Sequence, residues 1–365
     1  MTDARFPDTW APYMTWAKHQ RKARWDLTGS NLLPCAMEEM PGARDAMELY
    51  GRNDDGWPPL VEAVAQRFGV TTEEVATATG GSGANFLAFA ALVRPGDHVL
   101  VESPGYDPHG GAARFLGAEV TTFQRRWKDR FRLDPEAVAR AVTPRTRAIV
   151  ITNLHNPSGA YASRADLEAI GAVARSVDAK VVVDEVYLDA SFGVDSTPAA
   201  RLGPEFISTS SLTKSYGLAG VRVGWLLADP DTIERCLRVR DVVDAVGSIP
   251  SETIGAFAFQ HLDRLLDRAR TILQANHRLM GAFVEGRKEL DWLVPAGGGV
   301  AFPRLLGVDD VSDFVEWARR HHDVGVTPGS LFDTPAHFRV ALAGERSVLE
   351  TGLQLLGQAL DDWGG

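Results

Sequence analysis

Short apolar runs rich in valine and isoleucine alternate along the chain with longer stretches whose apolar residues recur at helical spacing. The runs expected to form strands cover residues 98–102, 147–153, 180–183, 206–207 and 223–228. Continuous apolar runs separated by helical stretches are typical of parallel strands buried on both faces of a sheet. The pattern therefore predicts an α/β fold with a mostly parallel central sheet.

The spacing of apolar residues predicts helices over residues 60–68 and 86–93. It also predicts a set of long helices over about 230–290. Near the N-terminus, Trp10, Tyr13 and Trp16 have near-helical spacing and predict an amphipathic helix within residues 7–25. We interpret its aromatic stripe as a packing surface, against the body of the protein or a sister subunit.

The C-terminal part of the chain has the pattern of a second, smaller unit. A glycine-rich segment at 295–302 predicts an edge strand after a hinge. The alternating segment 337–343 predicts a strand with Arg339 facing inward.

Composition narrows the classes of protein that the chain can represent. It has 365 residues and a net charge of −10, with no block of like charges, so nucleic acid and anionic membrane surfaces are not expected partners. No run approaches the roughly 18 apolar residues that span a bilayer, and residues 1–20 lack the apolar core of a secretory signal. Two cysteines, Cys35 and Cys236, suit a reducing compartment. These features predict a cytoplasmic protein.

The segment from Ser208 to Trp225 carries the most specific chemistry. It reads STSSLTKSYGLAGVRVGW and places Lys214 after a short strand and a run of hydroxyls, with Arg222 eight positions later. Desolvation and a nearby cation lower the pKa of a lysine, which makes its amine a nucleophile. Hydroxyls and a guanidinium also suit a phosphate group. An imine-forming lysine beside a phosphate site suggests pyridoxal phosphate (PLP).

The same segment resembles the lysine signature of class I/II aminotransferases, which are PLP-dependent enzymes of fold type I. The resemblance extends from about residue 26 to residue 343 and implies a large PLP-binding domain at 46–285. The small domain would combine residues 286–365 with an N-terminal helix and substrate loop at 1–45. By the resemblance, Lys214 would bind the cofactor as a Schiff base, and Ser211 and Arg222 would bind its phosphate.

Further residues match the cofactor site of that family. Thr79 to Asn85 opens a helix with small residues, and Ser82, Gly83 and Ala84 fall at the phosphate-binding positions. The resemblance also implies that Tyr50 reaches the cofactor phosphate of a partner subunit, so the expected assembly is a homodimer.

The ring of the cofactor would be held by residues that follow the predicted strands. Asp184 is an acid at the end of a buried strand, which is costly without a cationic partner, and the resemblance supplies the protonated pyridine nitrogen. Tyr187 and Asn156 match the groups that bind the 3′ oxygen of the ring. Tyr106 matches the aromatic residue that stacks on it. The resemblance assigns catalytic roles to Lys214, Asp184 and Tyr187.

The resemblance implies small-molecule substrates, an L-amino acid and a 2-oxo acid. In the family, an arginine at the position of Arg339 binds the α-carboxylate, and Asn156 and a glycine-containing loop also line the pocket. Here that loop, with Gly29, Ser30 and Asn31, departs from the usual Gly-Glu-Pro. Glu38 and Glu39 nearby suggest a basic or specialised amino acid.

We interpret several polar residues as structural. His155 has no evident metal cluster or triad partner. Asp107 and His109 lie near Tyr106 and could contact a substrate, but a structural role is favoured. His321, His322 and Asp323 lack the spacing of a metal site, so no metal is expected.

Three functions remain open from the sequence. The first is a PLP-dependent aminotransferase. The second is a PLP-dependent lyase, cyclase or synthase of the same fold, which could share Lys214, Asp184 and Arg339. The third is a ligand-sensing transcriptional regulator, for which the roughly 25 residues before the match offer no basic DNA-binding module.

Overall fold

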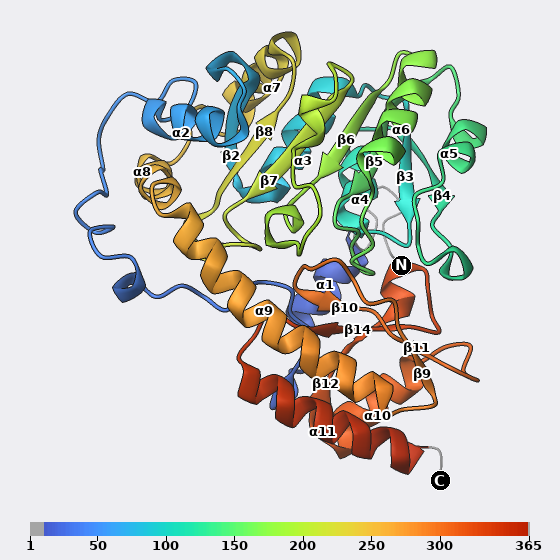
Figure 1. Cartoon of the computed structure of the whole chain (residues 1–365). Helices are drawn as coiled ribbons and strands as arrows, with labels where there is room; N and C mark the ends of the chain where they lie inside the picture. The colour runs from blue at the N-terminus through green and yellow to red at the C-terminus, as the bar shows by residue number, and fades with distance from the viewer. Residues whose placement is uncertain (1–10, 364–365) are drawn as a thin grey trace, which may run out of the picture.

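The computed structural model describes residues 11–363, which form a large domain and a smaller one joined along one side by a long helix (Figure 1). The large domain is built on a seven-stranded sheet with the order β2-β8-β7-β6-β5-β3-β4. Its strands are β2 (Val75–Thr79), β3 (His98–Ser103), β4 (Glu119–Gln124), β5 (Thr146–Thr152), β6 (Lys180–Asp184), β7 (Phe206–Ser211) and β8 (Val223–Leu227). Within it β4, β3, β5, β6 and β7 pair in parallel, whereas β8 is antiparallel to both β7 and β2. The predicted α/β fold with a mostly parallel sheet is confirmed.

The central strands are buried on both faces because their apolar residues alternate between two cores. Leu100, Ile149 and Val181 pack on one face with helices α5 (Pro135–Ala141) and α6 (Arg164–Ser176). On the other face Val99, Val150, Val182 and Ile207 pack against α3 (Gly80–Leu92), α4 (Asp107–Phe115) and α7 (Pro230–Val243). This arrangement explains the continuous Val/Ile runs in the sequence.

The register of the sheet brings three polar residues into one row at its carboxyl edge. Thr152 at the end of β5 is opposite Asp184 at the end of β6, and Asp184 is opposite Thr209 of β7. In open α/β sheets, ligands bind in the crevice beyond this edge.

The small domain has a three-stranded antiparallel sheet, order β10-β14-β13, covered by helices. Its elements are β9 (Leu290–Asp291), β10 (Val300–Ala301), β11 (Arg304–Leu305), α10 (Ser312–His321), β12 (Val324–Gly325), β13 (Thr327–Pro328), β14 (Phe338–Ala341) and α11 (Arg346–Trp363). The expected edge strand is β10, and the strand carrying Arg339 is the central β14.

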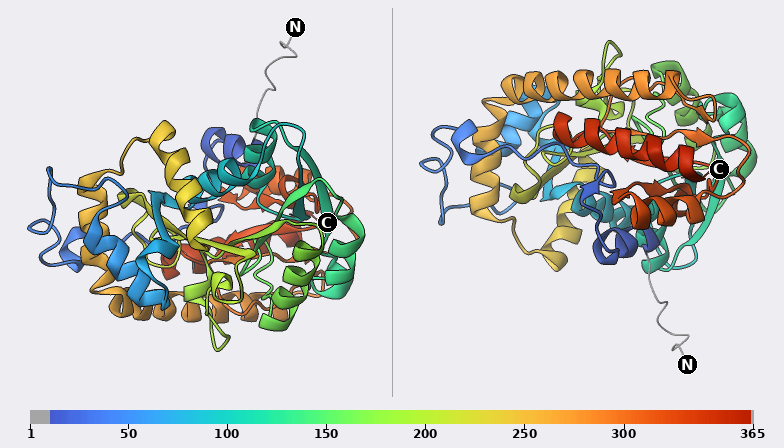
Figure 2. Two further views of the ribbon diagram at one scale, coloured as in Figure 1. Left: turned by 90° about the horizontal axis from the view of Figure 1, so that it is seen from above. Right: turned by 90° about the horizontal axis from the view of Figure 1, so that it is seen from below.

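Helix α9 (Leu262–Glu285) belongs to both domains. Leu262, Leu265 and Leu266 lie in a core of the large domain, together with residues of α2 (Pro58–Phe68) and α8 (Ile249–Phe259). Met280, near its other end, lies in the core of the small domain. There α9 and α11 run side by side (Figure 2). Because α9 contributes to both cores, the division expected after residue 285 stays a prediction.

The N-terminal segment joins the small domain, and its helix lies within the range 7–25 expected from the sequence. Helix α1 covers Pro12–His19, and residues 7–10 lie outside the described part of the chain. Trp25 lies instead in β1 (Trp25–Asp26), which pairs in parallel with β12. The backbone N–H of Arg24 donates to Asp323 Oδ1 (2.9 Å) and that of Trp25 to Asp323 O (3.0 Å), so both residues are held by tertiary contacts outside the helix.

No helix among the described residues is both long and apolar enough to cross a membrane.

Gly224 in β8 is packed directly on the start of α3, and an added Cβ would collide with the backbone of Gly80. We expect Gly224→Ala to lower the free energy of unfolding by about 1–3 kcal/mol, because neither backbone segment can move freely. Gly220→Ala is the matched control, since a Cβ there meets no atom within 4 Å. Equal urea midpoints for the two variants would contradict this account of the contact.

Candidate active site

A cavity of about 670 Å³ lies at the carboxyl edge of the large sheet, where residues 13–31 and the ends of several strands meet. Most residues predicted from the sequence line it. They are Gly29, Ser82, Tyr106, Asn156, Asp184, Tyr187, Ser211, Lys214 and Arg222. The sheet therefore brings together residues that are spread over almost 200 positions of the chain.

Lys214 follows β7 and projects its amine into this cavity. Its Nζ donates to Ser30 Oγ (2.9 Å) and Asn31 Oδ1 (2.7 Å), both from the loop that departs from the family pattern. Burial lowers the pKa of Lys214 to about 8, Tyr13 opposes this shift, and Arg339 adds to it. A larger fraction of this amine than of an ordinary lysine amine is thus unprotonated near neutral pH, which favours a role as nucleophile or proton carrier.

Asp184 is buried at the end of β6 among neutral or weakly basic groups. Its Oδ2 accepts a hydrogen bond from Asn85 Nδ2 (2.8 Å) and lies 3.1 Å from His109 Nε2. Because a carboxylate only accepts, His109 carries the proton on Nε2 in this contact. Asn85 is itself fixed by Thr209, whose hydroxyl donates to Asn85 Oδ1 (2.6 Å). No lysine or arginine pairs with Asp184 in the described chain, so the carboxylate is free to face a cationic ligand.

Asn85 and His109 were missed from the sequence, since His109 was interpreted as structural and Asn85 was only part of the helix start. They come from α3 and α4, and only the tertiary fold brings them to Asp184. The available signal was their position, because each is a polar residue in the first or second turn of a helix that packs at the carboxyl edge of the sheet.

The start of α3 and Arg222 form the other end of the cavity. Gly80 has φ +69°, and a Cβ there would collide with the Arg222 guanidinium, so glycine lets the arginine lie across the helix N-terminus. Arg222 donates only to backbone oxygens of Ala219 (3.3 Å) and Thr79 (3.4 Å), and no carboxylate pairs with it within residues 11–363. Helix N–H groups and an unpaired guanidinium favour an anion such as phosphate.

Of the three predicted residues in the first turn of α3, Ser82 lines the cavity. Gly83 follows it in the helix, and the Ala84 side chain is buried in the core of the large domain. Any contribution of Ala84 to phosphate binding would therefore come from its backbone, and the roles of all three stay predictions.

Arg339 is fully buried just behind the cavity. Its guanidinium donates to Asn156 Oδ1 (3.2 Å), Thr28 O (3.1 Å) and the Tyr13 hydroxyl, and the rings of Tyr13 and Phe332 each lie 4.9 Å from Cζ. All three partners are neutral oxygens. Tyr13 was predicted as a packing residue, and the structure adds this polar contact to the packing.

The predicted ring contacts lie around the same space. Tyr106 approaches His109 edge to face, with ring centroids 5.3 Å apart, and its hydroxyl contacts Met14 Sδ (3.4 Å). Tyr187 lies with its ring centroid 5.9 Å from Lys214 Nζ, and burial raises the pKa of its phenol. Their roles toward a cofactor stay predictions.

Other candidates lie outside the cavity. His155 is buried and bonded to Ser158 Oγ and Pro104 O, as a structural residue would be. Glu39 is bound by Arg268 and Glu38 lies near Arg44, and neither carboxylate lines the cavity. The suggestion of a basic substrate from these two residues therefore has no support in the geometry. Tyr50 is 90% exposed and does not line the cavity of its own chain.

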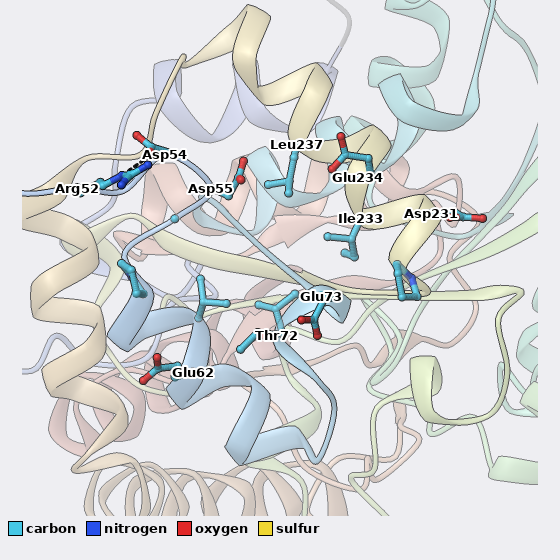
Figure 3. Close-up of a pocket in the computed structure, with 15 residues that line it drawn as sticks. Arg52, Asp54, Asp55, Glu62, Thr72, Glu73, Asp231, Ile233, Glu234 and Leu237 are labelled. Carbon is cyan, nitrogen blue, oxygen red and sulfur yellow. Dashed lines mark hydrogen bonds and ion pairs between the residues drawn. The ribbon is translucent and has the colours of Figure 1, made fainter.

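A second, larger cavity of about 810 Å³ lies between α2 and α7 (Figure 3). Six carboxylates line it, together with Arg52 and several apolar side chains. They are Asp54, Asp55, Glu62, Glu73, Asp231 and Glu234. Such a lining repels phosphate and carboxylate ligands, and the cavity lacks an unpaired buried cation. It is not the place for the chemistry that Lys214 implies.

Comparison with known proteins agrees with this geometry. The family model for aminotransferase class I and II matches residues 10–356. The chain belongs to the class I and II aminotransferase family.

Individual relatives of this aminotransferase have different activities. Capreomycidine synthase of Streptomyces vinaceus is 32% identical over 96% of this chain and 93% of its own length. A probable N-succinyldiaminopimelate aminotransferase of Mycobacterium tuberculosis is 32% identical over 77% of this chain and 74% of its own. A PLP-dependent aminotransferase structure from Streptococcus suis superposes with a TM-score of 0.91, at 27% identity and 98% coverage of both chains.

The cofactor of this aminotransferase is PLP, and the cavity fits its three functional parts. The N-terminus of α3 and the unpaired Arg222 suit the phosphate. Asp184, which has no lysine or arginine partner in the described chain, suits the protonated ring nitrogen. Lys214, with its lowered pKa, suits the aldehyde.

The lowered pKa of Lys214 predicts a pH dependence for its labelling in the apoprotein. Only the unprotonated amine reacts with a small acylating reagent, so the rate should rise with pH and level off above about pH 8. An ordinary lysine amine, with a pKa of about 10.4, continues to gain reactivity beyond that point. Peptide mass spectrometry would follow Lys214 and, in the same digest, exposed Lys128. Parallel pH profiles for the two peptides would contradict the proposed desolvation.

Proposed function

We propose that this PLP-dependent aminotransferase binds the α-carboxylate of an L-amino acid at Arg339 and passes its amino group to a 2-oxo acid. The observation that carries the proposal is a fully buried guanidinium whose hydrogen-bond partners within residues 11–363 are all neutral oxygens. A buried charge without a counter-ion is costly, whereas a carboxylate ligand would pair with it through two N–H groups. Arg339 Nε also has no hydrogen-bond partner in the described part of the chain.

Lys214 is the group that would move the proton. With a pKa of about 8, the amine can take a proton from the substrate Cα near neutral pH, and it would return that proton at the carbon on the other side of the amino nitrogen. PLP, when bound, supplies the electron sink that makes such a proton removable. Asn156 contacts Arg339 directly and would orient the carboxylate, while the ring of Tyr106 limits the orientations of the substrate.

The alternative is cyclisation or elimination on a specialised amino acid. It is favoured by the 32% identity to capreomycidine synthase over nearly the whole chain. It is also favoured by Ser30 and Asn31, which contact Lys214 from a loop unlike the usual family sequence. Both reactions need the same Lys214, Asp184 and Arg339, so the product distinguishes them.

The test is a half-reaction of the PLP-loaded protein with a panel of amino acids and no 2-oxo acid. We expect one amino acid to bleach the visible band of bound PLP and to release up to one equivalent of its 2-oxo acid. Lys214→Ala should abolish both changes. Arg339→Gln should raise the KM for that amino acid roughly 10- to 100-fold, as expected for lost hydrogen bonds to a charged group.

Arg320→Gln is the control for Arg339→Gln, because it removes a guanidinium paired only with Glu316 on the surface of α10. A cyclised product, or ammonia with recovery of the visible band, would favour the alternative. Failure of the wild-type protein to bind PLP would exclude both.

We further propose that the enzyme is a homodimer in which Tyr50 completes the site of the partner. Tyr50 is 90% exposed, and neighbouring Met47 and Leu49 are also exposed. Val242 and Val243 at the end of α7 add further exposed apolar surface. An exposed group of large apolar side chains on a folded chain is typical of a protein interface.

Complementation between two inactive chains tests this arrangement. In a mixed dimer of Tyr50→Ala and Lys214→Ala chains, one site would combine an intact Lys214 with an intact Tyr50 from the other chain. We expect an equimolar mixture, unfolded and refolded together, to recover about a quarter of wild-type activity, because half of the dimers would carry one complete site of two. No recovery, although the chains form mixed dimers, would mean that Tyr50 acts within its own chain or not at all.

A cytoplasmic location is also proposed. Both cysteines are free thiols in the structure, and Cys236 is buried, which suits a reducing compartment.

A further inference from the structure

A buried ion pair lies behind the active site without lining it. Glu102, near the end of β3, and Arg125, just after β4, both have fully buried side chains, and Arg125 Nη1 lies 2.8 Å from Glu102 Oε2. Arg125 Nε also donates to the backbone oxygen of Phe131 (2.7 Å). Replacing a buried ion pair with apolar residues is often neutral or stabilising, so stability alone does not explain this one.

The second oxygen of Glu102 is directed at the end of the neighbouring strand. Glu102 Oε1 accepts from the backbone N–H of Thr152 (2.6 Å) and from the Thr152 hydroxyl. The same hydroxyl oxygen accepts from the backbone N–H of Asn156 (3.0 Å). Since that N–H can only donate, the Thr152 hydroxyl must give its own proton to the carboxylate, and its orientation is fixed from both sides.

This link ends at the carboxylate-binding arginine. Asn156, whose backbone is held by Thr152, accepts from Arg339 Nη1 through its side-chain Oδ1 (3.2 Å). The connection runs from Glu102 to Thr152, Asn156 and Arg339 and consists of successive hydrogen bonds between residues that are 0–6% exposed. A small shift of Asn156 would therefore move a direct partner of Arg339.

We propose that Glu102, with its charge balanced by Arg125, is a positioning residue that acts through the Thr152 hydroxyl to set the place of Asn156 and Arg339. The inference rests on the proposed function, because it assigns Glu102 to substrate carboxylate binding. Glu102 itself touches no ligand. Its role is to keep the segment 152–156 in one conformation while substrates enter and leave.

Thr152→Val tests the link with little change of shape, and Thr152→Ser restores the hydroxyl. The control is Thr146→Val at the opposite end of the same strand, where an equally buried hydroxyl contacts His98 Nδ1 (2.7 Å). Glu102→Gln is the second test, because both Glu102 oxygens accept hydrogen bonds and an amide NH₂ cannot replace either one.

The probe is the amino acid that releases most 2-oxo acid with the wild-type enzyme. We expect Thr152→Val and Glu102→Gln each to raise its KM about tenfold, the effect of roughly one lost hydrogen bond, with a smaller change in kcat. The visible band of bound PLP changes with pH, and we expect the midpoint of this change to shift in Thr152→Val and in Glu102→Gln. Thr152→Ser should restore both values, and Thr146→Val should change only the melting temperature. If Thr152→Val folds poorly, Thr152→Ala lacks the same hydroxyl and should give the same result.

The outcomes separate this inference from the proposed function. A wild-type enzyme that binds PLP and releases 2-oxo acid, with KM and band titration unchanged in Thr152→Val and Glu102→Gln, would overturn the positioning role alone. Equal effects of Thr146→Val and Thr152→Val would also overturn it, because they would indicate a general loss of stability. A wild-type enzyme with neither property would overturn the proposed function and the inference together.

Discussion

The alignment of parallel strands at one edge of the large sheet is the constraint on which the site depends. Because β5, β6 and β7 are paired in a single register, Thr152, Asp184 and Thr209 lie in a row. A slip of one residue would turn each of these side chains to the opposite face. The packing of the apolar strand residues on both faces of the sheet therefore determines where the polar residues of the site lie.

Several charged side chains lie at this edge of the sheet and are not neutralised by other residues of the described chain. Asp184, Arg222 and Arg339 have no side-chain partner of opposite formal charge other than His109 beside Asp184. Asp184 and Arg339 are buried, which is unfavourable for a charge without a counter-ion, whereas Arg222 is exposed. A ligand with matching charges would remove the penalty for the two buried groups. Glu102 and Arg125, by contrast, are buried as an ion pair with each other.

Most of this site could be predicted because its residues occur in local motifs. Lys214, Asp184 and Asn156 each follow an apolar strand, and Arg339 lies in an alternating one, so sequence order alone indicates their position. Asn85 and His109 could not be found in this way, because they reach Asp184 from two helices through tertiary packing. The sequence pattern also did not show where the N-terminal helix ends. Backbone contacts with Asp323, about 300 residues away, hold Arg24 and Trp25 against the segment that leads into β12, outside that helix.

Helix α9 has a thermodynamic consequence beyond its role as a connection. Its 24 residues form a continuous rod of about 36 Å, with one end in the core of the large domain and the other in the core of the small domain. Melting either core would expose apolar residues of the helix and remove part of the surface on which the other core is packed. Unfolding of one domain should therefore destabilise the other, because a single helix contributes to both cores.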